Sequence, residues 1–255
     1  MKKVRILDLS LPLEESASEL FSAEVQHQDH KSSVDRIKDL FGCAEEDLPQ
    51  GLGWASDVVR LTAHTGTHVD APWHYFPTSE GKKARTIDEM PLEWFYGDGV
   101  VLDMRHKARG TVVTVEDLEQ ALKGIGYGIK SGDIVLIQTG SDKYWREKEY
   151  PDVRCGMGRE STLWLIEHGV KVVGTDAYGW DRPFWAVKEE FQRTQDRSIL
   201  WAAHRVGIER EFCQIEKMAN LDKLPRAFGF TVACFPIKLA GGSGGWCRAV
   251  AIIEE

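Results

Sequence analysis

The possible folds of this chain are limited most by an alternation of two sequence patterns between residues 99 and 176. One pattern is a short apolar stretch bounded by glycine, aspartate or serine, which is typical of a buried strand. The other places apolar residues at the spacing of a helix face. The strand pattern covers 99–104, 131–140 and 170–176, and the helix pattern covers 115–122 and 160–168. Strands that alternate with single helices predict an α/β fold.

The other segments fit one domain. Further strands are expected at 4–11, 57–62, 230–236 and 249–253, a loop at 181–190 and the start of a helix at 198–206. No linker rich in Pro, Gly or Ser divides the 255 residues, so we expect a single domain over 1–255, with a mixed sheet flanked by helices. The polar segment 22–53 contains one amphipathic stretch, 33–41, before Gly42. This segment is expected to be an insertion or a lid.

The charges and the cysteines restrict the partners and the compartment. The chain has 32 Lys and Arg against 40 Asp and Glu, a net charge of -8, and no basic run, which argues against nucleic acid and membrane surfaces as partners. No apolar run approaches the roughly 20 residues of a membrane-spanning helix. The five cysteines are scattered without a C-x-x-C pair, which is typical of reduced thiols in a cytoplasmic protein. A small molecule is therefore the expected partner.

Four potential metal ligands lie within eleven residues: His64, His68, Asp70 and His74. In a fully extended segment they would spread over roughly 30 Å, at about 3.3 Å per residue, whereas the ligands of one ion lie about 2.0–2.2 Å from it. The segment must therefore curl, and Gly66 and Pro72 are the positions at which the backbone can do so. Three of the eight histidines of the chain gather here, which is hard to reach by chance.

Ligands of this kind point to a catalytic metal ion. Imidazole and carboxylate groups suit Zn, Mn or Fe, and the cluster has no thiol that would make a closed cysteine site. A catalytic metal ion lowers the pKa of a bound water toward about 7. The cluster therefore predicts a metal-dependent hydrolase.

Two alternatives stay open at this point. The cluster could be a non-catalytic metal-binding module that only stabilises the fold. Alternatively, His68, Asp70 and His204 could form the 2-His-1-carboxylate triad of a non-haem iron oxygenase. The oxygenase is disfavoured because it leaves His64 and His74 unused, and because an antiparallel jelly roll does not suit the α/β order.

The string His64-x-Gly66-Thr67-His68-x-Asp70-x-Pro72-x-His74 resembles the signature of the putative cyclase family, which includes bacterial kynurenine formamidases and isatin hydrolases. The resemblance continues through 131–140, 174–176, 203–204, 216–222 and 244–251. It implies a swivelling β/β/α domain that assembles as a homodimer or homotetramer. It also implies a hydrolase that opens an amide or lactone bond, of the arylformamidase type of tryptophan catabolism or of the isatin hydrolase type.

Position by position, the resemblance assigns the metal ligands of the family to His64, His68, Asp70, His204 and Glu216. His64 and His68 would bind one ion, and Asp70 would bridge it to a second ion. His204 would bind that second ion, and Glu216 would be the other bridging carboxylate. His74 would be the catalytic acid/base. The cofactor implied is Zn²⁺ or Mn²⁺, with one or two ions per subunit.

The substrate pocket is where the chain departs from the family pattern. Kynurenine formamidases carry a substrate-facing tryptophan in a proline-rich segment after the first strand, and residues 12–21 of this chain contain no tryptophan. Trp180, Phe184 and Trp185 instead follow the strand that ends at Asp176, where α/β proteins place ligand-binding loops. These three aromatic residues are expected to bind a small aromatic substrate.

Overall fold

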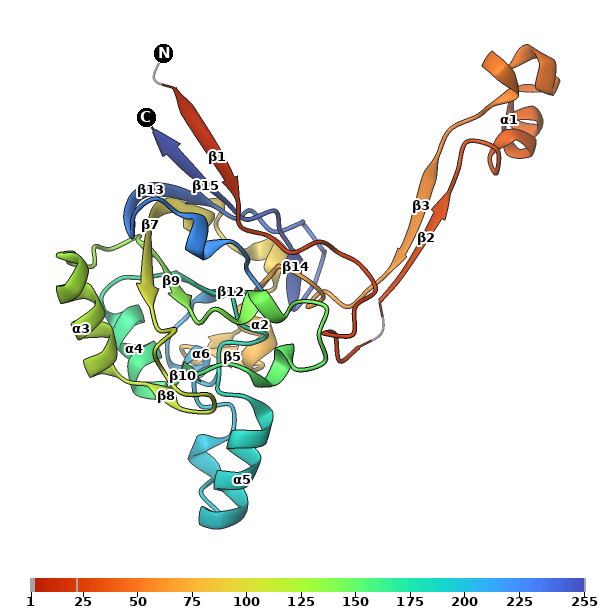
Figure 1. Ribbon diagram of the computed structural model, residues 1–255. Coiled ribbons are helices and arrows are strands. Elements are labelled where there is room, and N and C mark those ends of the chain that lie inside the picture. The colour runs from red at the N-terminus through yellow and green to blue at the C-terminus, as the bar shows by residue number, and fades with distance from the viewer. Residues whose placement is uncertain (1–2, 22, 255) are drawn as a thin grey trace.

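The computed structural model describes residues 3–21 and 23–254. Its centre is a nine-stranded mixed sheet, with the strands in the order β1-β15-β13-β7-β9-β11-β12-β4-β14 (Figure 1). In that order the strands are Val4–Asp8, Val250–Glu254, Phe228–Ala233, Tyr96–Asp103, Ile134–Gln138, Val172–Thr175, Cys213–Glu216, His68–Asp70 and Gly244–Trp246. The four strands from β7 to β12 are parallel, and the outer strands pair antiparallel. The predicted α/β class with a mixed sheet is confirmed.

The central strands are buried on both faces of the sheet. Alternate residues of β7 and β9 belong to different apolar clusters, with Val101 and Leu136 on one side and Val100 and Val135 on the other. The second side is covered by α3 (Val115–Ile125) and α4 (Arg159–Glu167), which lie next to each other in Figure 1. Strands covered on both faces read as continuous apolar runs, which is why the sequence pattern located them.

Residues 24–60 form an arm. Strand β2 (Glu24–Gln28) pairs antiparallel with β3 (Ser56–Arg60), and helix α1 (Val34–Phe41) lies between them in the chain. Figure 1 shows that this arm, residues 24–60, projects away from the main sheet with α1 at its tip. The strand expected at 57–62 is therefore part of the arm rather than of the main sheet. The arm extends away from the sheet, whereas a lid would lie over it.

Two expectations about residues 181–206 differ from the structure. The segment expected as a loop at 181–190 contains helix α5 (Phe184–Thr194), which begins directly after Pro183, a residue that favours helix starts. The helix expected from 198 begins only at α6 (Val206–Glu209). Before α6, Trp201 has a φ of 58°, a left-handed conformation that interrupts a right-handed helix.

The remaining α-helix and strands are short. They are α2 (Pro72–Tyr75), β5 (Thr78–Ser79), β6 (Lys82–Lys83), β8 (Val112–Val113) and β10 (Gly156–Met157). Short 3-10 helices also occur between the elements. Among the described residues, no helix is long and apolar enough to cross a membrane.

Candidate metal centre

The histidine segment curls because its backbone is held at several points. Gly66 has a φ of 60°, which favours glycine. The next residue, Thr67, donates its hydroxyl hydrogen to the carbonyl of Lys217 and accepts a hydrogen bond from the Leu11 N–H at 2.8 Å. The ammonium of Lys217 in turn donates to the carbonyl of His64 at 2.8 Å. These contacts join the curl to two distant parts of the chain.

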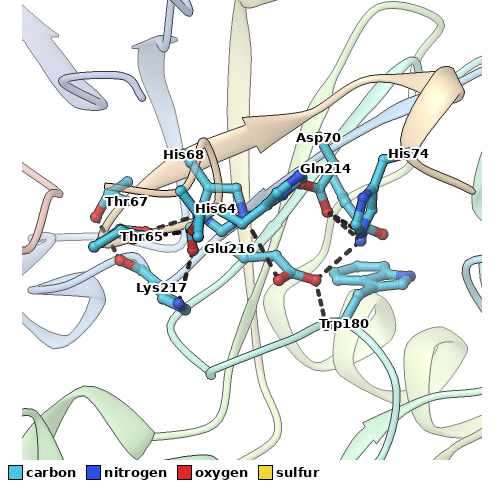
Figure 2. Close-up of polar contacts among 12 residues, drawn as sticks. His64, Thr65, Thr67, His68, Asp70, His74, Trp180, Gln214, Glu216 and Lys217 are labelled. Atoms are coloured by element: carbon cyan, nitrogen blue, oxygen red, sulfur yellow. Dashed lines mark hydrogen bonds and ion pairs between the residues drawn. The ribbon is translucent and has the colours of Figure 1, made fainter. Parts of the chain in front are cut away.

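Strand pairing then places four polar side chains on one face of the sheet. In β4, His68 and Asp70 alternate with the buried Val69, so both project to the face opposite that apolar cluster. Strand β12 lies beside β4, with Gln214 opposite Asp70 and Glu216 opposite His68. His64 and His74 reach the same point from the residues before and after β4 (Figure 2).

His68 shows most directly that the centre suits a cation. Its Nδ1 donates to the carbonyl of Gly66 at 2.8 Å, so Nε2 is left with a lone pair. This nitrogen is buried and has no hydrogen-bond partner among the described residues. It lies 3.2 Å from an Asp70 oxygen and 3.8 Å from a Glu216 oxygen. A lone pair that faces two carboxylates requires a positive charge between them.

The ligand atoms gather in two sets of three. His64, Asp70 and His74 form one set, and His68, Asp70 and Glu216 form the other, with all atoms of a set within 4.8 Å of one another. Within the first set, His64 Nδ1 lies 2.6 Å from Asp70 Oδ1. Imidazole nitrogens and carboxylate oxygens are the donors that Zn²⁺ and Mn²⁺ accept, so the residues fit a divalent metal ion.

His204 reaches the centre from the segment before α6. Its Nδ1 binds a carboxylate oxygen of Asp181, and the same carboxyl group accepts hydrogen bonds from the N–H groups of Ala203 and His204. His204 Nε2 therefore faces the centre, 3.6 Å from Glu216 Oε1 and 3.9 Å from Asp70 Oδ2. A carboxylate that orients a histidine in this way is typical of metal sites.

The two carboxyl groups at the centre differ in acidity. Burial raises the pKa of Asp70, but the surrounding His74, His64 and His68 outweigh it and hold that pKa well below its usual range. Burial and the charge of Asp70 raise the pKa of Glu216. Asp70 is therefore the more firmly ionised of the two.

His74 differs from the other histidines in its protonation. Burial lowers its pKa to about 4, although Asp70 opposes this shift. Its ring lies 4.1 Å from that of His64 and 5.3 Å from that of Trp201, measured between centroids. Its Nε2 is 3.9 Å from Asp70 Oδ2, within the first ligand set, so its assignment as acid/base rather than ligand stays a prediction.

A cavity of about 980 Å³ adjoins the centre, which is in the range of small-molecule sites. His64, His74, His204 and Glu216 line it at the centre, and Phe184, Val187 and Phe191 of α5 line another part. Leu20 and Phe21, which precede the arm, also contribute to its wall.

The three aromatic residues predicted to bind substrate lie in different places. Phe184 lines the cavity. The indole of Trp180 is buried in the apolar cluster under α4, where its Nε1 donates to Thr162 at 2.9 Å, and it is the backbone N–H of this residue that binds Glu216. Trp185 is 38% exposed and donates to the carbonyl of Asp152 outside the cavity wall. The expectation for Trp180 and Trp185 is corrected accordingly.

Two residues of the centre were not predicted from the sequence, Asp181 and Gln214. Asp181 lies in a loop far from the motif, and no spacing points to it. Gln214 has a usable signal, because it stands two residues before Glu216 and a strand places such residues on one face. Recognising it required β12 to be predicted as a strand.

Comparisons with known proteins place this geometry in a family. The family model described as "Putative cyclase" matches residues 7–182. Among similar proteins, the kynurenine formamidases of Erythrobacter litoralis (strain HTCC2594) and Salinibacter ruber (strain DSM 13855 / M31) are 28% and 29% identical over 75% of this chain, and 74% and 77% of their own lengths. Cyclase-like protein 1 of Arabidopsis thaliana is 25% identical over 76% of this chain and 68% of its own length.

Solved structures share the fold. An isatin hydrolase bound to the product analogue thioisatinate superposes with a TM-score of 0.78 over 99% of this chain and 93% of its own, at 18% identity. Isatin hydrolase A from Labrenzia aggregata gives 0.76 over 99% and 94% of the chains, at 23% identity. Because the family model spans most of the chain and includes the whole histidine segment, this protein belongs to the putative cyclase family.

Proposed function

We propose that this protein is a metal-dependent hydrolase that opens an amide or lactone bond of a small aromatic substrate. The observation that carries the proposal is the convergence of three histidines and two carboxylates on one point beside a cavity of about 980 Å³. A purely structural metal site has no need of such a cavity, which argues against a non-catalytic module. The iron oxygenase is further disfavoured, because the sheet is mixed and parallel at its centre rather than an antiparallel jelly roll.

The residues that would hold a divalent ion are His64, His68 and Asp70, with His204 and Glu216 beside them. We propose Zn²⁺ or Mn²⁺, since both accept this donor set. A bound ion of this kind would lower the pKa of a water molecule and polarise the substrate carbonyl.

His74 is the proposed proton carrier of the reaction. Because burial lowers its pKa to about 4, the imidazole is neutral near pH 7 and can accept a proton from the attacking water. It can then deliver that proton to the departing nitrogen or oxygen. His74 lines the cavity, which gives it access to a substrate.

The residues that line the cavity are consistent with a substrate that is aromatic and that yields a carboxylate when it is hydrolysed. Phe184 and Tyr178 offer aromatic faces on the wall. Arg154 also lines the cavity, is buried, and has no carboxylate within 4.0 Å among the residues of the described chain. Its guanidinium donates to the backbone carbonyls of Asp181 and Pro151. Opening an amide or a lactone creates a carboxylate, for which a guanidinium that is not engaged by a protein carboxylate is a suitable partner. The kynurenine formamidases and isatin hydrolases among the relatives support an amide of an aromatic compound.

We also propose that the protein forms a homodimer or homotetramer through the arm. The arm exposes large apolar side chains that are not covered in the single chain, namely Leu40, Phe41, Trp54, Val58 and Val59. Clustered exposure of this kind marks interaction surfaces. Analytical ultracentrifugation of the whole chain tests this, and a monomer at micromolar concentration would contradict it.

The reaction is tested by single-turnover assays on N-formylkynurenine, isatin and a dienelactone, each with and without EDTA. We expect at least one of them to be hydrolysed, the rate to vanish after metal removal, and Zn²⁺ or Mn²⁺ to restore it. His68→Ala should abolish the rate, whereas the control His106→Ala, which removes an exposed histidine after β7, should not. Activity that survives complete metal removal would refute the proposed reaction.

A further inference from the structure

Gln214 occupies an unusual place for an amide side chain. It is fully buried in β12, on the same face as Glu216 and opposite Asp70 in the neighbouring strand. Figure 2 shows its side chain between Asp70 and Glu216, among the residues that would hold the metal. No role has been given to it so far.

The amide nitrogen of Gln214 lies within hydrogen-bond distance of three acceptors at once. It is 2.9 Å from Asp70 Oδ2, 2.7 Å from His204 Nε2 and 2.9 Å from Glu216 Oε1. An amide nitrogen has only two hydrogens, so it cannot satisfy three acceptors fully. Three acceptors around one point are the arrangement expected around a cation.

These acceptors are the same atoms that would bind a second metal ion. Asp70, His204 and Glu216 are the residues assigned to that ion by the family pattern. Metal ligands lie about 2.0–2.2 Å from the ion, so an ion among these three atoms would overlap the amide nitrogen. The amide and a second ion therefore exclude each other.

The surroundings of the Gln214 amide group determine that its nitrogen, and not its oxygen, faces the three acceptors. Gln214 Oε1 is buried without a hydrogen-bond partner among the described residues, and such burial is unfavourable. Rotating the amide by half a turn would bring this oxygen against the carboxylate oxygens of Asp70 and Glu216, and the repulsion between the oxygens would be more unfavourable than an unsatisfied oxygen. The three acceptors therefore hold the amide in the orientation in which its nitrogen points toward them. In the part of the chain that the structure describes, His68 Nε2 is the other buried side-chain nitrogen or oxygen without a partner, and it remains available for the first ion.

We infer that Gln214 replaces the second metal ion, so that the centre binds one divalent ion per chain. The amide nitrogen occupies the position of the second ion, and its two hydrogens bind two of the three acceptors, Asp70, His204 and Glu216, at a time. This inference rests on the proposed function, because it presupposes that the histidine segment binds a metal ion.

The test is the metal content of Gln214→Glu, which keeps the size of the side chain but replaces its donor with a carboxylate. The new carboxylate would be repelled by Asp70 and Glu216 and would leave the position between them, so these groups and His204 should bind a second cation there. The control Gln192→Glu adds the same charge on an exposed part of α5. The proteins are loaded with Mn²⁺, freed of unbound metal and analysed by plasma mass spectrometry and by electron paramagnetic resonance.

We expect one ion per chain and an uncoupled Mn²⁺ spectrum for the unchanged protein and for Gln192→Glu. Gln214→Glu should hold two ions with a coupled spectrum. Gln214→Ala, which empties the position, should also hold two, and it decides the question if Gln214→Glu does not fold by circular dichroism. Two ions in the unchanged protein, or one ion in both folded Gln214 variants, would overturn the inference but leave the proposed hydrolase intact. No bound ion in the unchanged protein would overturn both.

Discussion

Replacing His74 with alanine separates the two roles that its position allows. As a proton carrier, His74 should contribute roughly 10²–10⁴-fold to turnover, which is the usual range for general acid–base catalysis. This range corresponds to about 3–5 kcal/mol of transition-state stabilisation. The metal content should stay unchanged, because His64, His68 and Asp70 remain.

The pH dependence of kcat/KM gives a second, independent test of the role of His74. Burial lowers the pKa of His74 to about 4, so the imidazole is mostly the neutral base above that pH and mostly protonated below it. At pH 5 about 90% of such a group is neutral, whereas a histidine with an ordinary pKa near 6.5 would be only about 3% neutral. The unchanged enzyme should therefore keep most of its kcat/KM at pH 5 and lose it near pH 4.

The assay is a profile of kcat/KM from pH 4 to 8, with metal content measured on the same samples by plasma mass spectrometry. His106→Ala serves as the matched control, since it removes an exposed histidine outside the cavity. A loss of metal in His74→Ala would show that His74 is a ligand. An acidic limb near pH 6.5 in the unchanged enzyme would refute the argument from burial.

Two further predictions concern the turn at the metal centre and the cavity wall. Gly66→Ala should lower the free energy of unfolding, measured by urea titration, by more than Gly81→Ala does. Both glycines have a positive φ, a conformation that costs an L-residue about 1–2 kcal/mol. At Gly66 the added Cβ would also lie 2.7 Å from Leu13 Cδ2, whereas nothing lies within 4 Å of a Cβ added at Gly81. Equal losses would contradict the steric argument. Phe184→Ala should raise KM for an aromatic substrate roughly tenfold, consistent with the burial of part of one aromatic ring, while Trp185→Ala, outside the cavity wall, should leave KM unchanged. A rise in both, or in neither, would show that Phe184 does not contact the substrate.

The sequence located the central strands because burial on both faces makes each of them a continuous apolar run. It did not locate β12, in which Gln214 and Glu216 alternate with Cys213 and Ile215. The polar side chains of that strand face the metal centre, so its sequence alternates polar and apolar residues instead of forming the continuous apolar run of a strand buried in the core. Prediction by hydrophobicity alone is weakest where a strand carries the site.

Helix α5 was missed for a related reason. Only Ala186 is buried among its residues, so it has no wide apolar face, and its start depends on Pro183. The placement of Trp180 also could not be derived from the sequence. A loop after a parallel strand indicates that some residues face a ligand, but here Gly179 and Tyr178 line the cavity while the indole of Trp180 packs into the core.

The arm is anchored at the cavity at both of its ends. Leu20 and Phe21 line the cavity just before the arm begins, and Thr62 and His64 line it just after the arm returns. Pairing of β2 with β3 holds these two ends together at the base, with Glu24 opposite Arg60. Both ends of the arm are thus part of the cavity wall. A partner subunit bound to the tip of the arm, as proposed above, would therefore contact a hairpin whose two ends both lie in the wall of the candidate metal site.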